Sequence, residues 1–381
     1  MSLLKSIQRD PELARELAQC VESKRPFRLL DLKLYLTRRC NLRCAMCTAW
    51  QERDAQDELS TDEVARLLEQ ARSLGLAHLK LFGGEPMLRQ DLDAIVEHAA
   101  GLGVRCTLIT NGSLLTGQRA EALVRAGLAQ LDLSLDAGSA SLHDAIRGVP
   151  GTWQRAVDGL QAVQSAAGRL GRRVTVRVNA VVMRQNVLDL PRLVSQAVSL
   201  GVDQVVFNPA IPQRDNARGP AASYVLTRQD ILRYNDEVAP AILKQDTPYR
   251  WSVDPAFLYI YGTRDEDVDN AAQCRYVERL QIERCFKPWY YMVIRENGDV
   301  LGCNTVKHPL GRLGNVRRKS VEEIWFSDAF RQFRAACTPP RFAECARCCY
   351  NLALLNRRLG QALAREHQVQ ESKPQYRESH T

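Results

Sequence analysis

Residues 32–47, LKLYLTRRCNLRCAMC, join a short apolar run to three cysteines within eight positions. The run LKLYL (32–36) reads as a β-strand, and Cys40, Cys44 and Cys47 fall in the loop that would follow it. Cysteines separated by three and then two residues are typical of metal ligands, but structural zinc and cubane iron–sulfur sites normally take four. Either a distant cysteine completes this set or the fourth position is left open for a small molecule.

The pattern of strand and loop continues to about residue 208. Five further apolar runs read as strands, at HLKLF (78–82), RCTLIT (105–110), LDLSLD (131–136), VTVRVNAVV (174–182) and QVVF (204–207). Amphipathic stretches between them predict helices over 60–75, 89–103, 115–127, 152–168 and 188–201. Six strands alternating with five helices predict an α/β fold with a parallel sheet, a partial (β/α)6 barrel of the TIM type.

This architecture predicts where reactive residues lie, because functional groups in such barrels gather where strands end. The three-cysteine loop follows the first strand, and Gly83-Gly84-Glu85-Pro86 follows the second. The sequence TNG (110–112) follows the third strand, while Ser134 and Asp136 close the fourth. We therefore expect all of these residues to meet at one face.

Composition excludes several classes of protein. Of the 381 residues 45% are apolar and 25% are charged, as in soluble globular proteins. The net charge of +8 is spread along the chain, so we expect no nucleic-acid partner, whereas an anionic substrate is compatible with it. The amino terminus lacks a signal-peptide pattern and no run of roughly 18 apolar residues occurs, so we expect a cytoplasmic enzyme without membrane spans.

The rest of the chain divides by composition. We expect a helical segment over 1–30, the barrel over 31–245 with a last helix at 227–245, and a connector over 246–273. A second cysteine-rich domain would span 274–352, and a helix with a polar tail would span 353–381.

That second domain contains seven of the twelve cysteines, too many for disulfides in a reducing cytoplasm. Cys285 and Cys303 flank a predicted hairpin whose turn is Asn297-Gly298, and Cys345 and Cys348 form a later CxxC pair. These four thiols would meet at one place as ligands of a second metal site. A zinc ribbon would use the same number of ligands.

The motif Cys40-Asn-Leu-Arg-Cys44-Ala-Met-Cys47, followed by GGEP after the second strand, resembles the radical S-adenosylmethionine (SAM) superfamily. The resemblance implies that the three cysteines hold a [4Fe–4S] cluster whose open iron binds the amino and carboxylate groups of SAM. Reductive cleavage of SAM would give a 5′-deoxyadenosyl radical that removes a hydrogen atom from substrate. The electron would come from a low-potential donor such as flavodoxin or ferredoxin. A structural zinc knuckle is the weaker alternative, because no second cysteine pair lies nearby.

The resemblance also implies contacts to SAM. Gly83 and Gly84, with Pro86 in the same motif, would let backbone approach the methionyl part, and Glu85 would accept hydrogen bonds from its ammonium. The other implied cofactor contacts are Ser134 and Asp136 to ribose or carboxylate, Arg147 and more weakly Asn179 to carboxylate, and Phe207 and Asn208 to adenine. The position before the third cysteine, usually aromatic in the family, is Met46, for which we expect altered packing on adenine.

The second cysteine group resembles the auxiliary-cluster extensions called SPASM and twitch. No cysteine follows Cys349, so the chain looks like the shorter twitch form, with one auxiliary [4Fe–4S] cluster on Cys285, Cys303, Cys345 and Cys348. The remaining cysteines, Cys274, Cys337 and Cys349, would be buried apolar residues or donors of a hydrogen atom to a substrate radical.

The resemblance covers residues 31–350 but leaves the substrate open. Only about thirty residues precede the first strand, which leaves little room for a peptide-binding module. We therefore expect a small polar substrate, such as a sugar, aminocyclitol or nucleoside, that undergoes dehydrogenation or epimerisation in natural-product biosynthesis. The alternatives are a peptide-modifying or sulfatase-maturing enzyme and, from another class, a non-catalytic zinc protein.

Overall fold

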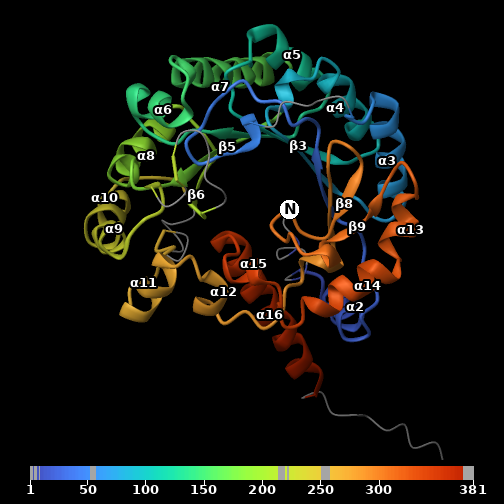
Figure 1. Cartoon of the computed structure of the whole chain (residues 1–381). Coiled ribbons are helices and arrows are strands. Elements are labelled where there is room, and N and C mark those ends of the chain that lie inside the picture. The colour runs from blue at the N-terminus through green and yellow to red at the C-terminus, as the bar shows by residue number, and fades with distance from the viewer. Residues whose placement is uncertain are drawn as a thin grey trace, which may run out of the picture.

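The computed structural model describes residues 3, 7, 9–51, 57–212, 219–220, 223–249 and 258–371, with side chains to residue 364. In this part of the chain the strands form one curved nine-stranded sheet in the order β6-β5-β4-β3-β2-β1-β7-β8-β9 (Figure 1). The parallel strands of the barrel are β1 (Asp31–Tyr35), β2 (His78–Phe82), β3 (Arg105–Thr110), β4 (Gln130–Ser134), β5 (Thr175–Val182) and β6 (Gln204–Pro209). The predicted partial barrel is confirmed.

Helices cover the outer side of this sheet (Figure 1). They are α3 (Thr61–Ser73), α4 (Leu92–Gly101), α5 (Gly117–Arg125), α6 (Ala140–Arg147), α7 (Thr152–Arg169) and α8 (Leu190–Ser199). Ser60 caps α3, accepting a hydrogen bond from the backbone N–H of Glu63, whose carboxylate accepts one from the N–H of Ser60.

Alternation along each strand separates the two faces of the sheet. Leu32 and Leu34 of β1 are fully buried in the core against the helix layer, whereas Lys33 and Tyr35, which face inward, are half-buried. Burial of each leucine contributes about 1.5–3 kcal/mol, so the outer face carries most of the stability. The inner face is therefore free to carry polar and charged side chains.

The auxiliary region continues the barrel sheet. The strand β7 (Tyr291–Ile294) pairs in parallel with β1, and the antiparallel strands β8 (Asp299–Leu301) and β9 (Arg312–Asn315) follow it. The predicted hairpin turn at Asn297-Gly298 is confirmed, with Gly298 at a φ of 87°. Its helices are α11 (Asp265–Ala272), α12 (Tyr276–Arg279), α13 (Val321–Trp325), α14 (Asp328–Ala336), α15 (Ala343–Ala346) and α16 (Tyr350–Glu371).

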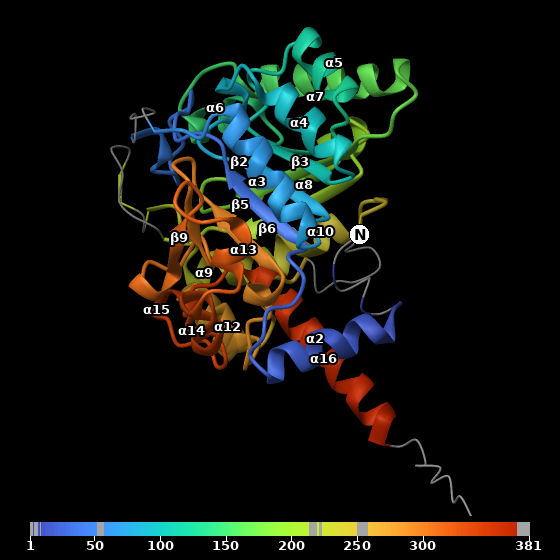
Figure 2. The ribbon, with the colours of Figure 1, turned by 90° about the vertical axis from the view of Figure 1, so that its right-hand side faces the viewer.

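The amino-terminal helix α2 (Pro11–Glu22) packs against α16 at one end of the molecule (Figure 2). This contact joins the first and last parts of the described chain. None of the described helices combines the length and the apolar composition that spanning a lipid bilayer requires.

The structure adds detail to two predicted stretches. The single helix predicted over 227–245 is α9 (Arg228–Arg233), a π-helical turn (Tyr234–Val238) and α10 (Ala239–Leu243). Pro240 has no N–H, and its ring crowds the carbonyl four residues earlier, so the helix widens before it. The connector over 246–273 contains α11, while its residues 250–257 lie outside the described part.

Candidate functional site

The three-cysteine loop is fixed to its neighbours by backbone hydrogen bonds. The N–H groups of Gly84 and Glu85 donate to the carbonyls of Thr37 (2.8 Å) and Arg39 (2.7 Å), just before Cys40. On the other side, the N–H groups of Arg43 and Ala45 donate to carbonyls in the last turn of α6. The loop therefore supplies hydrogen-bond donors to carbonyls at the carboxyl end of α6, where a helix needs donors from outside.

The two glycines of GGEP are required by this close approach. A Cβ at Gly83 would lie 2.4 Å from the carbonyl oxygen of Thr37, and one at Gly84 would lie 2.1 Å from that of Arg39. Both distances are far below van der Waals contact, and the neighbouring atoms are backbone. The expected approach to SAM stays a prediction, but the contact that excludes a side chain here is the cysteine loop.

Glu85 joins the second and third strand-end loops. Its carboxylate is 1% exposed and accepts hydrogen bonds from the Thr110 hydroxyl (2.6 Å) and from the N–H groups of Asn111 (2.8 Å) and Met87 (3.0 Å). Burial raises the pKa of Glu85, and these hydrogen bonds oppose that shift. A carboxylate has about four acceptor positions, so one is left, and the expected bond from the SAM ammonium stays a prediction.

Arg147 is also engaged inside the protein. Its Nη2 lies 2.8 Å from Oδ2 of the fully buried Asp136, and its Nη1 donates to Sγ of Cys44 at 3.8 Å. Burial lowers the pKa of Arg147, but the charges of Asp136 and Cys44 raise it by more, so Arg147 stays protonated. Asp136 and Arg147 thus form a buried ion pair beside Cys44, and their expected contacts to SAM stay a prediction.

The three thiols have the chemistry that an iron–sulfur cluster needs. Cys44 is buried and Cys40 and Cys47 are half-buried, and burial raises the pKa of Cys40 to about 12, with Cys44, Glu85 and Cys47 adding to the shift. Within the described residues no three His, Cys, Asp or Glu side chains converge as ligands of a single ion do. Cysteine thiolates are the ligands that hold iron–sulfur clusters, so the residue types of this loop fit such a cluster.

The remaining expected contacts lie near the same edge. Ser134 and Asn179 are direct partners in register on the inner face of β4 and β5. Met46 packs on a small apolar cluster formed by Ile146, Met183, Ala210 and Tyr224. This cluster lies where β5 and β6 end, so a contact between Met46 and adenine remains compatible with the fold.

The two β6 residues point in opposite directions. Phe207 is 2% exposed and buried on the outer, helix-covered side, so its side chain does not face the expected adenine position. Asn208 lies on the inner side, where its Oδ1 accepts from Nδ2 of Asn351 at 3.0 Å. Strand alternation is the physical reason, because adjacent residues of one strand cannot share a face.

The auxiliary thiols come from separate elements. Cys285 precedes β7, Cys303 follows β8, Cys345 lies in α15 and Cys348 precedes α16. Burial raises the pKa of Cys345 to about 12, and the nearby thiols of Cys285 and Cys303 add to the shift. Burial also raises the pKa of Cys348, and Cys285, Cys349 and Cys303 add to that shift. The fold therefore brings the four expected ligands into one neighbourhood.

The three leftover cysteines occupy different places. Cys337 belongs to the auxiliary group, since burial, Cys285, Cys345 and Cys303 raise its pKa and its carbonyl accepts from the N–H of Cys285. Cys274 lies beyond β6, where its Sγ donates to the carbonyl of Ala210 at 3.8 Å. Cys349 interacts electrostatically with Lys33 on the inner face of β1. Their role as hydrogen donors stays a prediction.

Two residues near the auxiliary thiols were missed from the sequence. Burial raises the pKa of Cys303, but Lys287 and hydrogen bonds from Thr305 bring it below its usual value. Asn356 of α16 donates to Sγ of Cys285 at 3.7 Å and accepts from the N–H of Phe286 at 2.9 Å. Lys287 lies two residues after Cys285, so the sequence could have indicated a charge near that thiol. Nothing in the sequence indicates that Asn356 lies near Cys285.

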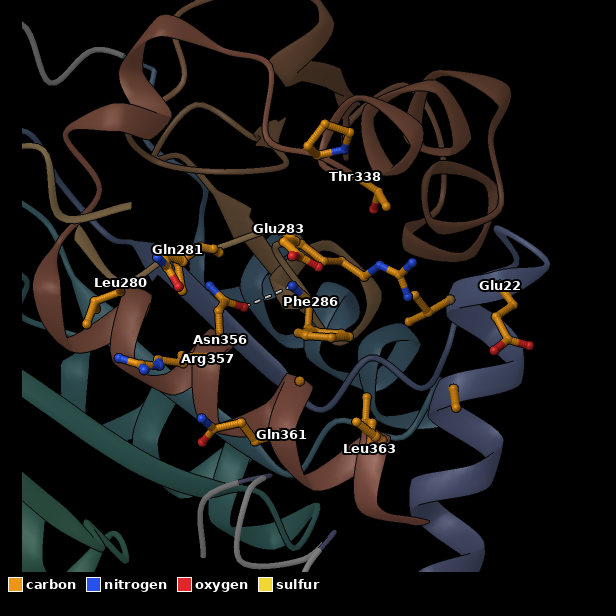
Figure 3. A pocket seen from close by; sticks show the side chains of 17 residues that line it. Glu22, Leu280, Gln281, Glu283, Phe286, Thr338, Asn356, Arg357, Gln361 and Leu363 are labelled. Carbon is orange, nitrogen blue, oxygen red and sulfur yellow. Dashed lines mark hydrogen bonds between the residues drawn. The ribbon is translucent and has the colours of Figure 1, made fainter. Parts of the chain in front are cut away.

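A pocket of about 970 Å³ lies between α2, α16 and residues 280–286 (Figure 3). Phe286 and Asn356 form part of its wall, and the hydrogen bond between them is drawn in the close-up. The pocket therefore adjoins Cys285 through Asn356.

Comparisons with known proteins agree with this geometry. A profile of the radical SAM superfamily matches residues 34–197, and SPASM, an iron–sulfur cluster-binding domain, matches residues 285–349. An AdoMet-dependent heme synthase of Oleidesulfovibrio alaskensis is 28% identical over 320 residues, 83% of this chain and 79% of that protein. A PqqA peptide cyclase of Methylocella silvestris is 38% identical over 315 residues, 78% of this chain and 74% of that protein. The crystal structure of Streptococcus suis SuiB bound to S-adenosylmethionine has a similar fold, with a TM-score of 0.64 at 19% identity over 88% of this chain and 76% of SuiB.

Proposed function

Because the chain belongs to the radical SAM superfamily and carries a SPASM domain, we propose that it cleaves SAM reductively and removes a hydrogen atom from a substrate on the inner face of the sheet. The chain is an enzyme whose cofactors are a [4Fe–4S] cluster, SAM and auxiliary iron–sulfur. The observation that carries the proposal is the three-thiol loop, fixed by backbone hydrogen bonds at the carboxyl ends of the strands.

Each side chain has a defined part in this proposal. Cys40, Cys44 and Cys47 hold the cluster with one iron open, and the bound cluster and SAM supply a 5′-deoxyadenosyl radical. Arg147 stabilises the thiolate of Cys44 and is itself held by Asp136. Ser134, Asn179 and Asn208 present polar groups to SAM from the inner face, and Met46 packs near its adenine.

The auxiliary thiols form the second part. Cys285, Cys303, Cys345 and Cys348 supply four ligands to one auxiliary [4Fe–4S] cluster, which leaves it no open iron. Lys287 provides positive charge beside Cys303. A cluster with four protein ligands suits electron transfer, so a dehydrogenation could pass its second electron there.

The first candidate substrate is a small polar molecule, such as a sugar, aminocyclitol or nucleoside, that is dehydrogenated or epimerised. The polar inner face of the sheet supports it. Product mass separates the two reactions, since dehydrogenation removes two mass units and epimerisation removes none. Solvent deuterium would enter carbon only in the epimerisation.

Modification of a peptide is the second candidate. It is favoured by the 38% identity to a PqqA peptide cyclase, which aligns over 74% of that relative. A peptide product would carry a mass change confined to one or two residues, which fragmentation locates.

Anaerobic reconstitution with iron and sulfide tests the proposal. On addition of dithionite and SAM the protein should form 5′-deoxyadenosine, while the Cys44→Ala variant should form none. Wild-type protein that holds iron and sulfide but forms no 5′-deoxyadenosine would overturn the proposal.

A further inference from the structure

Two lysines lie side by side on the inner face of the sheet. Lys33 of β1 and Lys80 of β2 are direct partners in the parallel register, so their Cα atoms are about 4.8 Å apart. The residues on either side of them, Leu32, Leu34, Leu79 and Leu81, are fully buried on the outer face. Both lysine side chains therefore point inward from the same height of the sheet.

No carboxylate in the described part of the chain forms an ion pair with Lys33 or Lys80. The ammonium of Lys33 instead lies 3.7 Å from the ring centroid of Phe82 and 5.3 Å from that of Tyr35. Such cation–π contacts are worth roughly 0.5–2 kcal/mol, less than burying a charge costs. The two lysines thus lie side by side on adjacent strands, and the described part of the chain gives neither an ion pair with a carboxylate.

Across the same inner face the opposite arrangement occurs. Arg177 of β5 is paired with Asp132 of β4, its partner in register, and Asp132 also accepts from Nε2 of Gln130 at 2.7 Å. One half of the inner face is therefore electrically balanced within the protein. In the half formed by β1 and β2, Asp31 lies beside His78, its partner in register, whereas Lys33 and Lys80 form no ion pair in the described part of the chain.

The charges around Lys33 support this description. Burial lowers the pKa of Lys33 to about 7, with Lys287 and Lys80 adding to the shift, while Cys349 and Cys303 oppose it. An anion placed between the two lysines would relieve both the desolvation and the mutual repulsion.

We propose that Lys33 and Lys80 form a binding site for an anionic group, a carboxylate or a phosphate, of the substrate. The inference rests on the proposed function, and it specifies which substrates fit: those that place a negative charge against β1 and β2. Neutral sugars and cyclitols would lack the group that this site recognises.

The lysines could instead balance the thiolates of the auxiliary cluster, and the position of Lys80 separates the two ideas. Lys287 acts directly on Cys303, and Cys349 and Cys303 act on Lys33. Lys80 lies on β2, one strand farther than Lys33 from β7 and the auxiliary cysteines. Replacing Lys80 should therefore weaken anion binding without changing the auxiliary cluster's midpoint potential.

The test uses the reconstituted holoenzyme with SAM and three probes, glutarate, inorganic phosphate and the neutral myo-inositol. We expect calorimetry to detect saturable binding of at least one anion and none of myo-inositol. Lys33→Met and Lys80→Met should each weaken that binding roughly tenfold or more, because each removes a charged hydrogen bond. Lys80→Arg should retain most of the binding, and Lys319→Met, at an exposed lysine, should leave it unchanged.

The comparison of glutarate with phosphate identifies the preferred group. Equal affinity of the lysine variants and the wild type, with both clusters' absorbance intact, would overturn the proposal. An absence of anion binding to the wild type would also overturn the proposal. The same holds if Lys80→Met shifts the midpoint potential of the auxiliary cluster while it binds the anion as the wild type does. Formation of 5′-deoxyadenosine is measured in a separate assay without substrate. If the protein binds the anion through the lysines but forms no 5′-deoxyadenosine, the proposed function is refuted and the anion site is not.

Discussion

The two groups of cysteines are held by the fold in different ways. Cys40, Cys44 and Cys47 share one loop, and backbone hydrogen bonds to GGEP and to α6 hold that loop at the carboxyl ends of the strands. The auxiliary cysteines Cys285, Cys303 and the pair Cys345/Cys348 come from three segments of the chain, next to the hairpin whose first strand, β7, pairs with β1. In the proposed assignment, the first arrangement would supply three ligands from one loop and the second would supply four from segments far apart in the sequence.

This difference suggests a division of labour. A loop with three thiols leaves one iron for a small molecule, and a site enclosed by four thiols leaves none. Buried positive groups are present at both, with Arg147 beside Cys44 and Lys287 beside Cys303. Changes at the two sites should therefore have separable effects, the first on SAM cleavage and the second on turnover of substrate.

Removal of a loop thiol should have the largest effect. Cys44→Ala should abolish 5′-deoxyadenosine formation and lower the iron content by about four atoms per chain, the number in one cubane cluster. Chromatography and iron analysis measure both. Cys106→Ala, at a fully buried thiol of β3, serves as the control and should cost about 1 kcal/mol of stability but no iron. Equal iron loss in both variants would contradict this assignment.

Removal of an auxiliary thiol should spare SAM cleavage. Cys348→Ser should lose the auxiliary cluster and the conversion of substrate, yet form 5′-deoxyadenosine at a rate within a few-fold of the wild type. Cys337→Ser should keep the auxiliary cluster, because the four expected ligands remain. If Cys337→Ser loses the cluster and Cys348→Ser does not, Cys337 is the ligand in place of Cys348.

A methyl group at Gly84 should separate the cysteine loop from GGEP. In Gly84→Ala the Cβ would meet the Arg39 carbonyl at 2.1 Å, so unfolding should become easier by roughly 3 kcal/mol and SAM affinity should fall. The control, Gly168→Ala in α7, has no atom within 4 Å of the added Cβ and should gain about 0.5–1 kcal/mol. Denaturant unfolding measures both, and a Gly84→Ala variant as stable as the wild type would refute the close approach.

The smallest effect concerns one hydrogen bond to the auxiliary site. Asn356→Leu removes the donor to Sγ of Cys285 and should lower the midpoint potential of that cluster by roughly 40 mV, the equivalent of a 1 kcal/mol hydrogen bond. Asn351→Leu, on the same helix but bonded to β6, should leave the potential unchanged. A redox titration followed by electron paramagnetic resonance compares them, and equal potentials in all three proteins would contradict the role of Asn356.

Local sequence patterns predicted the barrel well, because each strand and helix carries its own alternation or caps. The strands at 78–82 and 105–110 were placed correctly, and so was the turn at Gly298. The pairing of β7 with β1 was not predicted, since residues 260 positions apart show no local signal of contact. That pairing decides how the auxiliary site joins the barrel.

At the candidate site, the sequence predicted which residues gather there better than it predicted which of them form hydrogen bonds or ion pairs with each other. The three-cysteine loop and GGEP do lie together, but hydrogen bonds assign Glu85 to Thr110 and Asn111, and Arg147 to Asp136. Such partners depend on which carboxylates become buried, and burial of a charge is settled only by tertiary packing. The sequence did not predict that Lys33 and Lys80 lie side by side, because that depends on how β1 and β2 pair.

The central claim is that the loop cluster is open and the auxiliary cluster is closed. It is tested most directly by electron–nuclear double resonance on the reduced protein with SAM labelled in its amino nitrogen and carboxylate oxygens. A Cys303→Ser/Cys348→Ser variant, which keeps only the loop cluster, should show hyperfine coupling to both labels. A variant that keeps only the auxiliary cluster should show none. Absence of coupling in the first variant, or its presence in the second, would contradict the account.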